Sequence, residues 1–326
     1  MGQFIKMTSI DFFYKIKPLI PRRLQIALRR MSASYTRRRT GHIWPISPEA
    51  AGAPEGWPQW PDNKKFALIL IHDVDTVLGL ENCLKLMNLE KRLGFRSSFN
   101  FVPEGYLTPE PVRQSLMDSG FEVGVHGLKH DGKLFVNRRK WETKARRINE
   151  YLREWDAVGF TSPSMLRNLD WTSELNIEYG CSTFDTDPFE PQPDGFHTIF
   201  PFWARNNANT KKYVELPHTL PQDYILFVIL REQDNRIWKN KLDWVAANGG
   251  MALLNVHPDY INFEETPCSR EQYPIGHYTD LLEYVDAKYA GQYWHVLPRE
   301  LAQYWRSLML ENSRAARAAN RGVKAP

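Results

Sequence analysis

Two aspartates directly follow a run of apolar residues, and their spacing indicates chemistry more than packing. Residues 66–71 (FALILI) are apolar, and His72-Asp73-Val74-Asp75 comes immediately after them. Six successive apolar residues are typical of a strand buried on both faces, as in parallel sheets and barrels. In an extended chain residues i and i+2 point the same way, so Asp73 and Asp75 would project together. Two like charges this close need a cation or a proton between them, which predicts a metal site or acid–base chemistry.

Further residues that can bind a metal recur where later strands are expected to end. They are His126 and His130 after residues 121–125, Asp185 and Asp187 after residues 181–184, and His257 after residues 251–256. Two histidines four residues apart can place both imidazoles on one side of a turn. Each group alone also has an ordinary explanation, because exposed histidine pairs are often incidental and aspartate commonly caps helices and turns. Together, two histidines and one aspartate around an open position make a set of the catalytic zinc type.

The elements that would carry these residues alternate between strand and helix. Strands are expected at residues 66–71, 97–102, 121–125, 158–160, 181–184 and 251–256, with two more candidates at 198–203 and 213–216. Helices are expected at residues 79–93, 109–119, 137–157, 171–179, 235–248, 278–289 and 298–309. Such alternation is typical of βα units around parallel strands, and α/β proteins build their sites at the carboxyl ends of the strands. The fold class is therefore α/β, with one catalytic domain.

Over about residues 64–300 the chain resembles the polysaccharide deacetylases of carbohydrate esterase family 4. The HDVD stretch at residues 72–75 is similar to that family's first motif, an acidic pair at the end of the first barrel strand. His126-Gly-Leu-Lys-His130 matches its two histidines separated by three residues, and Leu254-Asn255-Val256-His257 is similar to its last motif. The resemblance implies an irregular (β/α) barrel with seven or so parallel strands.

The resemblance also implies a role for each of these residues. Asp75, His126 and His130 would hold a divalent metal, usually Zn²⁺, and Asp73 would be the general base. His257 would protonate the leaving amine. The implied reaction is hydrolysis of the N-acetyl group of an amino sugar in a glycan or glycan precursor, so the expected partner is a carbohydrate.

The chain departs from the family at the third motif, Arg-x-Pro, whose arginine steadies the catalytic aspartate. Residues 159–163 read Gly-Phe-Thr-Ser-Pro, so Thr161 stands in the arginine position and supplies no charge to Asp73. Arg167 is a candidate substitute. Asp185 or Asp187 loosely matches the fourth motif, and an orienting role or turn capping are both open for them.

Two further functions stay open beside the deacetylase. One is a C–N hydrolase of a small cyclic amide or ureide on the same scaffold. The other is a non-catalytic, glycan-binding descendant, which the loss of the motif-three arginine at Thr161 would explain. Three scattered cysteines argue against a disulfide framework and a thiolate zinc site.

Charge and composition divide the chain into four parts. A basic extension at residues 1–40 carries ten Lys or Arg against one acid, and a Pro/Gly/Trp-rich lead-in follows at 41–63. The barrel would occupy residues 64–310, and a basic tail residues 311–326.

Residues 7–31 of the extension alternate apolar and basic side chains. This stretch predicts either a helix packed on the barrel or peripheral contact with an anionic membrane, and nucleic acid is disfavoured because the aromatics lack the spacing of a stacking platform. The sequence contains no apolar stretch near the ~20 residues of a membrane span and no signal peptide pattern. A cytoplasmic protein is expected, with the inner membrane face open as its site of action.

Overall fold

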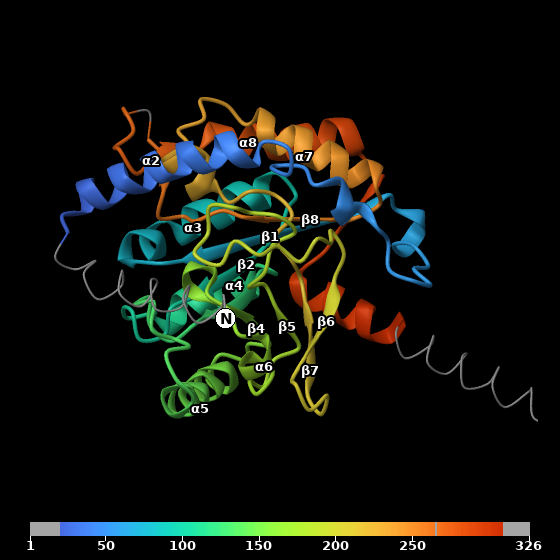
Figure 1. Cartoon of the computed structure of the whole chain (residues 1–326). Coiled ribbons are helices and arrows are strands. Elements are labelled where there is room, and N and C mark those ends of the chain that lie inside the picture. Colours follow the sequence, from blue (N-terminus) through green and yellow to red (C-terminus); the bar gives the residue numbers. More distant parts are fainter. Residues whose placement is uncertain (1–19, 265, 309–326) are drawn as a thin grey trace, which may run out of the picture.

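The computed structural model describes residues 20–264 and 266–308, and a parallel sheet curled around β1 organises this part of the chain (Figure 1). The sheet runs in the order β11-β1-β2-β3-β4-β5-β7-β6, and β8 pairs with β1 as well. Its strands are β1 (Phe66–Val74), β2 (Ser98–Phe101), β3 (Glu122–His126), β4 (Gly159–Thr161), β5 (Tyr179–Gly180), β6 (Phe202–Arg205), β7 (Lys212–Glu215), β8 (Met251–Asn255) and β11 (Tyr293–His295). Apart from the antiparallel pair β6–β7, the described strand pairs of this sheet are parallel.

Strand β1 lies at the centre because its apolar run is covered from every side. All nine of its residues are buried. Residues 67–71 pair with β8, residues 71–74 pair with β2, and residues 66–68 pair with the short β11. A strand with neighbours on both edges and apolar side chains on both faces has no surface left for water, which is the state that the apolar run predicted.

Thr219 joins the two sides of the sheet between β7 and β8. Its hydroxyl donates to the carbonyl of Met251 at 2.7 Å and accepts from the amide of Leu253 at 2.8 Å. The amides of Thr219 and Leu220 both donate to the carbonyl of Leu253, at 3.3 and 3.1 Å. Seven of the eight parallel strands, β1, β2, β3, β4, β5, β7 and β8, thus form an irregular barrel, which confirms the expected fold class.

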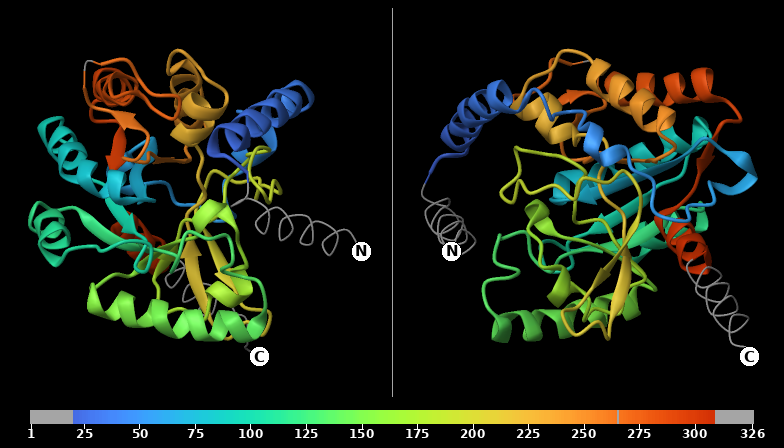
Figure 2. Two further views of the ribbon diagram at one scale, coloured as in Figure 1. Left: turned by 90° about the vertical axis from the view of Figure 1, so that its left-hand side faces the viewer. Right: turned by 45° about the vertical axis from the view of Figure 1, so that its right-hand side comes forward.

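Helices cover the outside of the barrel (Figures 1 and 2). They are α2 (Arg22–Thr40), α3 (Val77–Arg92), α4 (Glu110–Asp118), α5 (Arg138–Glu154), α6 (Leu169–Thr172), α7 (Arg236–Ala247), α8 (Gly276–Tyr289), the π-helical η5 (Tyr224–Ile229) and helical residues 298–308. Short 3₁₀ turns lie at η2 (Pro48–Ala51), η3 (Pro61–Asn63) and η4 (Pro163–Met165), and β9 (Ile261–Asn262) pairs with β10 (Tyr273–Pro274). Side-chain caps start two of the longer helices, because Thr76 accepts from the amide of Leu78 and Asn137 from that of Lys140.

Two sequence-based expectations about the fold were wrong. Residues 171–179 were expected to be helical, but α6 is a single turn and β5 already begins at Tyr179. The predicted strand at residues 181–184 therefore lies two residues too late. Tertiary contacts decide this stretch: the Tyr179 hydroxyl donates to the buried carboxylate of Glu122 at 2.9 Å, and a Cβ on Gly159 would stand 2.1 Å from that hydroxyl. The local pattern carries no trace of either contact.

Helix α2 lies outside the ring of strands and packs on η5 (Figure 2). Pro21 precedes its first turn, and the helix runs on to Thr40, well beyond the predicted amphipathic stretch at residues 7–31. Residues 7–19 of that stretch and residues 1–19 of the basic extension lie outside the described residues, as does the tail at 311–326. Among the described helices, none combines the length and the apolar composition that a membrane crossing requires.

Candidate active site

The two aspartates of the HDVD stretch meet at the carboxyl end of β1, inside the barrel mouth. Asp73 is only 3% exposed, and Asp75 follows the last strand residue, Val74. The amide of Asp75 donates to the carboxylate of Asp259 at 3.0 Å, and the hydroxyl of Thr76 donates to the same carboxylate at 2.5 Å. These contacts fix the turn out of β1 and with it the direction of the Asp75 side chain.

Asp75, His126 and His130 form a cluster that could hold a metal ion. The cluster offers one ligand atom per residue, all within 4.8 Å of one another. The Oδ1 atom of Asp75 lies 3.4 Å from Nε2 of His126 and 3.3 Å from Nε2 of His130. Ligand atoms about 2.0–2.1 Å from a tetrahedral ion are about 3.3–3.4 Å apart, so these separations fit one.

The Oδ1 atom of Asp75 is the observation that favours a cation. It is buried and has no hydrogen-bond partner, whereas Oδ2 accepts from the hydroxyl of Tyr260 at 3.3 Å. An unsatisfied carboxylate oxygen in a buried site is costly unless a positive charge compensates it. The residues present therefore fit a divalent cation.

The shifts in the pKa values of Asp75 and His126 both favour a positive charge beside the carboxylates. Burial favours neutral forms, yet the imidazoles of His130 and His126 hold the pKa of Asp75 below its ordinary value. Burial likewise lowers the pKa of His126, but the carboxylates of Asp73 and Asp75 outweigh it and raise that pKa overall. The pocket thus stabilises a cation next to its two carboxylates.

Asp73 is held by three neutral donors from three different strands. Asn100 of β2 and Thr161 of β4 donate to its Oδ1 atom at 3.0 and 2.8 Å, and Asn255 of β8 donates to Oδ2 at 2.9 Å. Gly124 of β3 makes room for this arrangement, because a Cβ there would stand 2.1 Å from the amide oxygen of Asn100. Burial opposes ionisation, but the neighbouring histidines and the Thr161 hydroxyl lower the pKa of Asp73.

Thr161 also determines which nitrogen of His126 carries the proton. Its hydroxyl has one hydrogen, and an ionised Asp73 can only accept it. The 2.6 Å contact between Thr161 Oγ1 and Nδ1 of His126 must therefore be an N–H donation from the imidazole. This leaves Nε2 of His126 with a lone pair on the side of Asp75, which is the tautomer a metal ligand needs.

His257 faces this cluster from the segment after β8 and is paired with Asp223. Its Nδ1 atom lies 2.6 Å from Oδ1 of Asp223, and its amide donates to Oδ2 at 2.8 Å. The hydroxyl of Tyr273 also donates to Oδ2, at 3.0 Å. Burial alone would lower the pKa of His257, but the Asp223 carboxylate outweighs it and raises the pKa to about 10.

The sequence reasoning missed Asp223, Asn100 and Asn255. Asp223 is fully buried and stands directly before the apolar residues of η5, just as Asp73 follows an apolar run. A carboxylate at the edge of an apolar run was the signal that could have identified it. Asn100 and Asn255 each stand in or at the end of a predicted strand, where an amide side chain gives no comparable signal.

The predicted substitute for the missing arginine does not contact Asp73. The guanidinium of Arg167 donates to the carbonyls of Gln192 and Asp194 and stacks on Phe184 at 5.2 Å. Arg167 therefore holds the loop around residues 192–194, and the neutral donors take its expected place at Asp73. Thr161 itself, at the position of the motif-three arginine, is one of those donors.

Asp185 and Asp187 also lie away from the cluster around Asp75. Asp185 is buried against Lys241, whose Nζ donates to its Oδ2 atom at 2.5 Å, and burial raises the pKa of Asp185 to about 6. Asp187 accepts from the amide of Phe189 at 2.9 Å, which is a turn contact. Asp187 therefore caps a turn. Asp185 forms a buried ion pair with Lys241.

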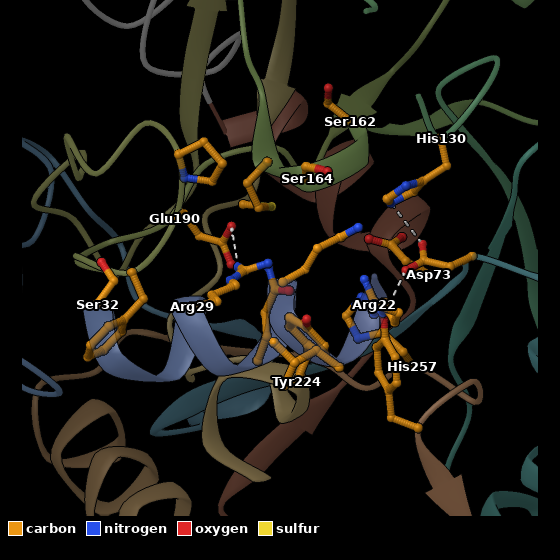
Figure 3. Close-up of a pocket in the computed structure, with 18 of the residues that line it drawn as sticks. Arg22, Arg29, Ser32, Asp73, His130, Ser162, Ser164, Glu190, Tyr224 and His257 are labelled. Carbon is orange, nitrogen blue, oxygen red and sulfur yellow. Dashed lines mark hydrogen bonds and ion pairs between the residues drawn. The ribbon is translucent and has the colours of Figure 1, made fainter. Parts of the chain in front are cut away.

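A cavity of about 480 Å³ opens over Asp73, Asp75 and His257, and α2 supplies one of its walls. Figure 3 shows His130 and His257 approaching Asp73 from different sides, with Arg29 and Glu190 farther along the cavity. The α2 residues that line it are Arg22, Gln25, Ile26, Leu28, Arg29 and Ser32.

A second cavity of about 620 Å³ shares Arg22, Asp75, His130 and Tyr260 with the first. Where the two cavities meet, Arg22 forms an ion pair with Glu271 at 2.6 Å. This pair ties α2 to the loop after β9 beside the residues that the two cavities share.

Comparison with known proteins supports the fold. No protein-family model and no curated protein matches the chain. Among solved structures, a candidate polysaccharide deacetylase from Mycobacterium smegmatis matches with 16% identity and a TM-score of 0.59, over 76% of this chain and 93% of that one. Puue allantoinase matches with 15% identity and a TM-score of 0.60, over 81% and 98%. A candidate polysaccharide deacetylase from Pseudomonas aeruginosa PAO1 matches with 15% identity and a TM-score of 0.54, over 81% and 98%.

Proposed function

Starting from the barrel that this chain shares with the polysaccharide deacetylases, we propose that it is a metal-dependent hydrolase that removes the N-acetyl group of an amino sugar. The observation that carries the proposal is the Oδ1 atom of Asp75, which has no hydrogen-bond partner and lies between two imidazole nitrogens. Asp73 lies two residues earlier, in β1. The fold shared with two candidate polysaccharide deacetylases supports the carbohydrate substrate class.

In this proposal Asp75, His126 and His130 hold the cation, and zinc is the ion that a set of two histidines and one carboxylate favours. A divalent cation supplies Lewis acidity there, polarising an amide carbonyl and lowering the pKa of a water molecule. Thr161 contributes by keeping His126 in the tautomer whose Nε2 is free to bind.

Asp73 and His257 then divide the proton transfers. Asp73 stays ionised among its neutral donors and would accept the proton of the attacking water as general base. His257 is protonated at neutral pH because Asp223 raises its pKa to about 10, so it would donate a proton to the leaving nitrogen. Asp73 lies in β1 and His257 follows β8, so in this proposal the base and the acid come from different elements of the barrel.

The test combines metal content with product analysis. Purified protein should carry about one equivalent of zinc, and His126→Ala should lose it. Wild-type protein should release acetate from N-acetylated amino sugars, and Asp73→Asn should retain the metal but lose turnover. If no metal binds, or if Asp73→Asn keeps full activity, the proposed chemistry is wrong.

A second candidate is hydrolysis of a small cyclic amide or ureide. The specific observation that favours it is the match to Puue allantoinase, which has a TM-score of 0.60 and is covered over 98% of its length. The volume of the cavity, about 480 Å³, is compatible with a small substrate. Ring opening of cyclic amides, measured beside acetate release on the same metal-loaded preparation, separates the two candidates.

A further inference from the structure

One face of α2 exposes a continuous apolar stripe. Leu24 is 50% exposed, Leu28 49%, Met31 71% and Tyr35 62%. Their spacing of four, three and four residues places all four on one side of the helix. In the described part of the chain only three other large apolar side chains are exposed to a similar degree, so the stripe is a concentrated feature and not scattered surface.

The opposite face of α2 already has its packing partner. Ile26 and Ala33 are each 5% exposed, and Ala33 packs against η5. Arg30 donates to the carbonyl of Val228 at 3.0 Å, and the guanidinium of Arg29 lies 4.9 Å from the ring centroid of Tyr224. The helix is therefore held in place by one face, and its packing on the barrel does not account for the stripe on the other.

The charge of α2 is entirely positive. Its sequence contains seven arginines and no acidic residue. At 100° per residue, Arg38 and Arg39 flank the stripe on its two sides, and both are exposed. Arg39 also donates to the hydroxyl of Tyr35 at 3.0 Å, at the edge of the stripe. Apolar side chains bordered by arginine form the pattern of a helix that lies in the plane of an anionic lipid surface.

We propose that the stripe of α2, formed by Leu24, Leu28, Met31 and Tyr35, binds an anionic lipid surface. A second copy of the chain is a poorer occupant, because two such helices face to face would oppose arginines with no acid on either helix to pair with them. Leu28 belongs both to the stripe and to the wall of the cavity above Asp73. Docking therefore places the cavity mouth beside the lipid headgroups, where a lipid-linked substrate would be presented.

The test measures sedimentation of the purified full-length protein with vesicles. Vesicles of phosphatidylcholine alone are compared with vesicles of equal parts phosphatidylcholine and phosphatidylglycerol. Wild-type protein should bind the mixed vesicles, and binding should weaken as salt is added. The double variant Leu24→Gln, Met31→Gln should bind at least about tenfold more weakly, because binding scales with buried apolar area. Neither residue lines the cavity.

Leu107→Gln is the matched control. Leu107 is 84% exposed and lies outside α2, between β2 and α4, so its replacement removes an exposed apolar side chain without touching the stripe. Circular dichroism would establish that all variants are folded. The control should bind mixed vesicles as the wild type does.

Three results would overturn the proposal. They are wild-type protein that stays in solution with mixed vesicles, equal loss of binding in the control, and a dimer that the double variant abolishes while vesicles capture nothing. Vesicle binding needs no substrate, so its failure is separate from a failure of the proposed hydrolase activity.

Discussion

Replacing Thr161 by valine tests whether a neutral hydroxyl holds the centre of the site together. The side chain keeps its shape but loses two hydrogen bonds, the 2.8 Å donation to Asp73 and the 2.6 Å contact that accepts from Nδ1 of His126. Asp73 Oδ1 then keeps the donation from Asn100 at 3.0 Å, while the buried N–H of His126 keeps only the longer 3.5 Å contact between Nδ1 and Oδ1 of Asp73.

The expected effect is large enough to measure in two ways. A hydrogen bond to a charged group contributes about 1.5–3 kcal/mol, and a buried donor that loses its close acceptor costs about 1–3 kcal/mol, so we expect a loss of about 2.5–6 kcal/mol of unfolding free energy. Without the acceptor on Thr161, only the 3.5 Å contact between Nδ1 and Asp73 favours the His126 tautomer with a free Nε2 atom. Loss of such an outer partner of a metal ligand weakens metal binding about 10–100-fold.

The assay is chelator competition for Zn²⁺, run beside denaturant unfolding of the metal-free protein. Thr161→Ser is the control, because serine keeps the hydroxyl and should bind zinc within about threefold of wild type. A Thr161→Val protein that binds zinc as tightly as the serine variant would refute the tautomer argument. Unchanged stability in the metal-free state would refute the claim that the hydroxyl satisfies two buried groups.

Three other changes follow from the described contacts. Asp223→Asn removes the charge that keeps His257 protonated, so turnover should fall about 10²–10⁴-fold with zinc content unchanged, measured by kcat and metal analysis on one sample. Arg22→Ala combined with Glu271→Ala removes two side chains that lie beside the residues shared by the two cavities, at a stability cost below about 1 kcal/mol because the pair is half exposed. The KM for a tetrasaccharide should fall relative to that for a monosaccharide. Burial raises the pKa of Glu215 to about 7. Between about pH 4.5 and 7 the folded state therefore binds a proton that the unfolded state has lost, and the folded state loses stability as pH rises through that range. The Glu215→Gln protein does not have this pH dependence, so its unfolding free energy relative to wild type should rise by up to about 3 kcal/mol from pH 5 to pH 8. Denaturant unfolding of both proteins at pH 5 and at pH 8 measures the difference.

The barrel and the set of metal-competent residues could be predicted from the sequence because both depend on short-range patterns. The apolar run of β1 ends at Asp73 and Asp75 within a few residues, and His126 and His130 are four residues apart. The alternation of strands and helices then implies that these strand ends meet at one side of the barrel.

The support of Asp73 could not be predicted because it is assembled from three separate strands. Thr161 was interpreted as the loss of an arginine, and Arg167 as its substitute. The structure instead gives Asp73 three short neutral donors, which is a property of strand register and not of any local motif. The same limit applies to α2, whose amphipathic pattern is visible in the sequence while its place at the cavity is not.

The position of α2 also has a consequence for how this protein can change over evolutionary time. The residues proposed for the chemistry come from strand ends and their loops, whereas one side of the substrate cavity comes from a helix that precedes the first strand. Mutations on that helix can alter what enters the cavity without disturbing Asp73, Asp75 or His257. The residues proposed for the chemistry and part of the wall that selects the substrate thus lie on different segments of the chain. A protein that keeps the same barrel can therefore change its substrate through substitutions within a helix of 19 residues.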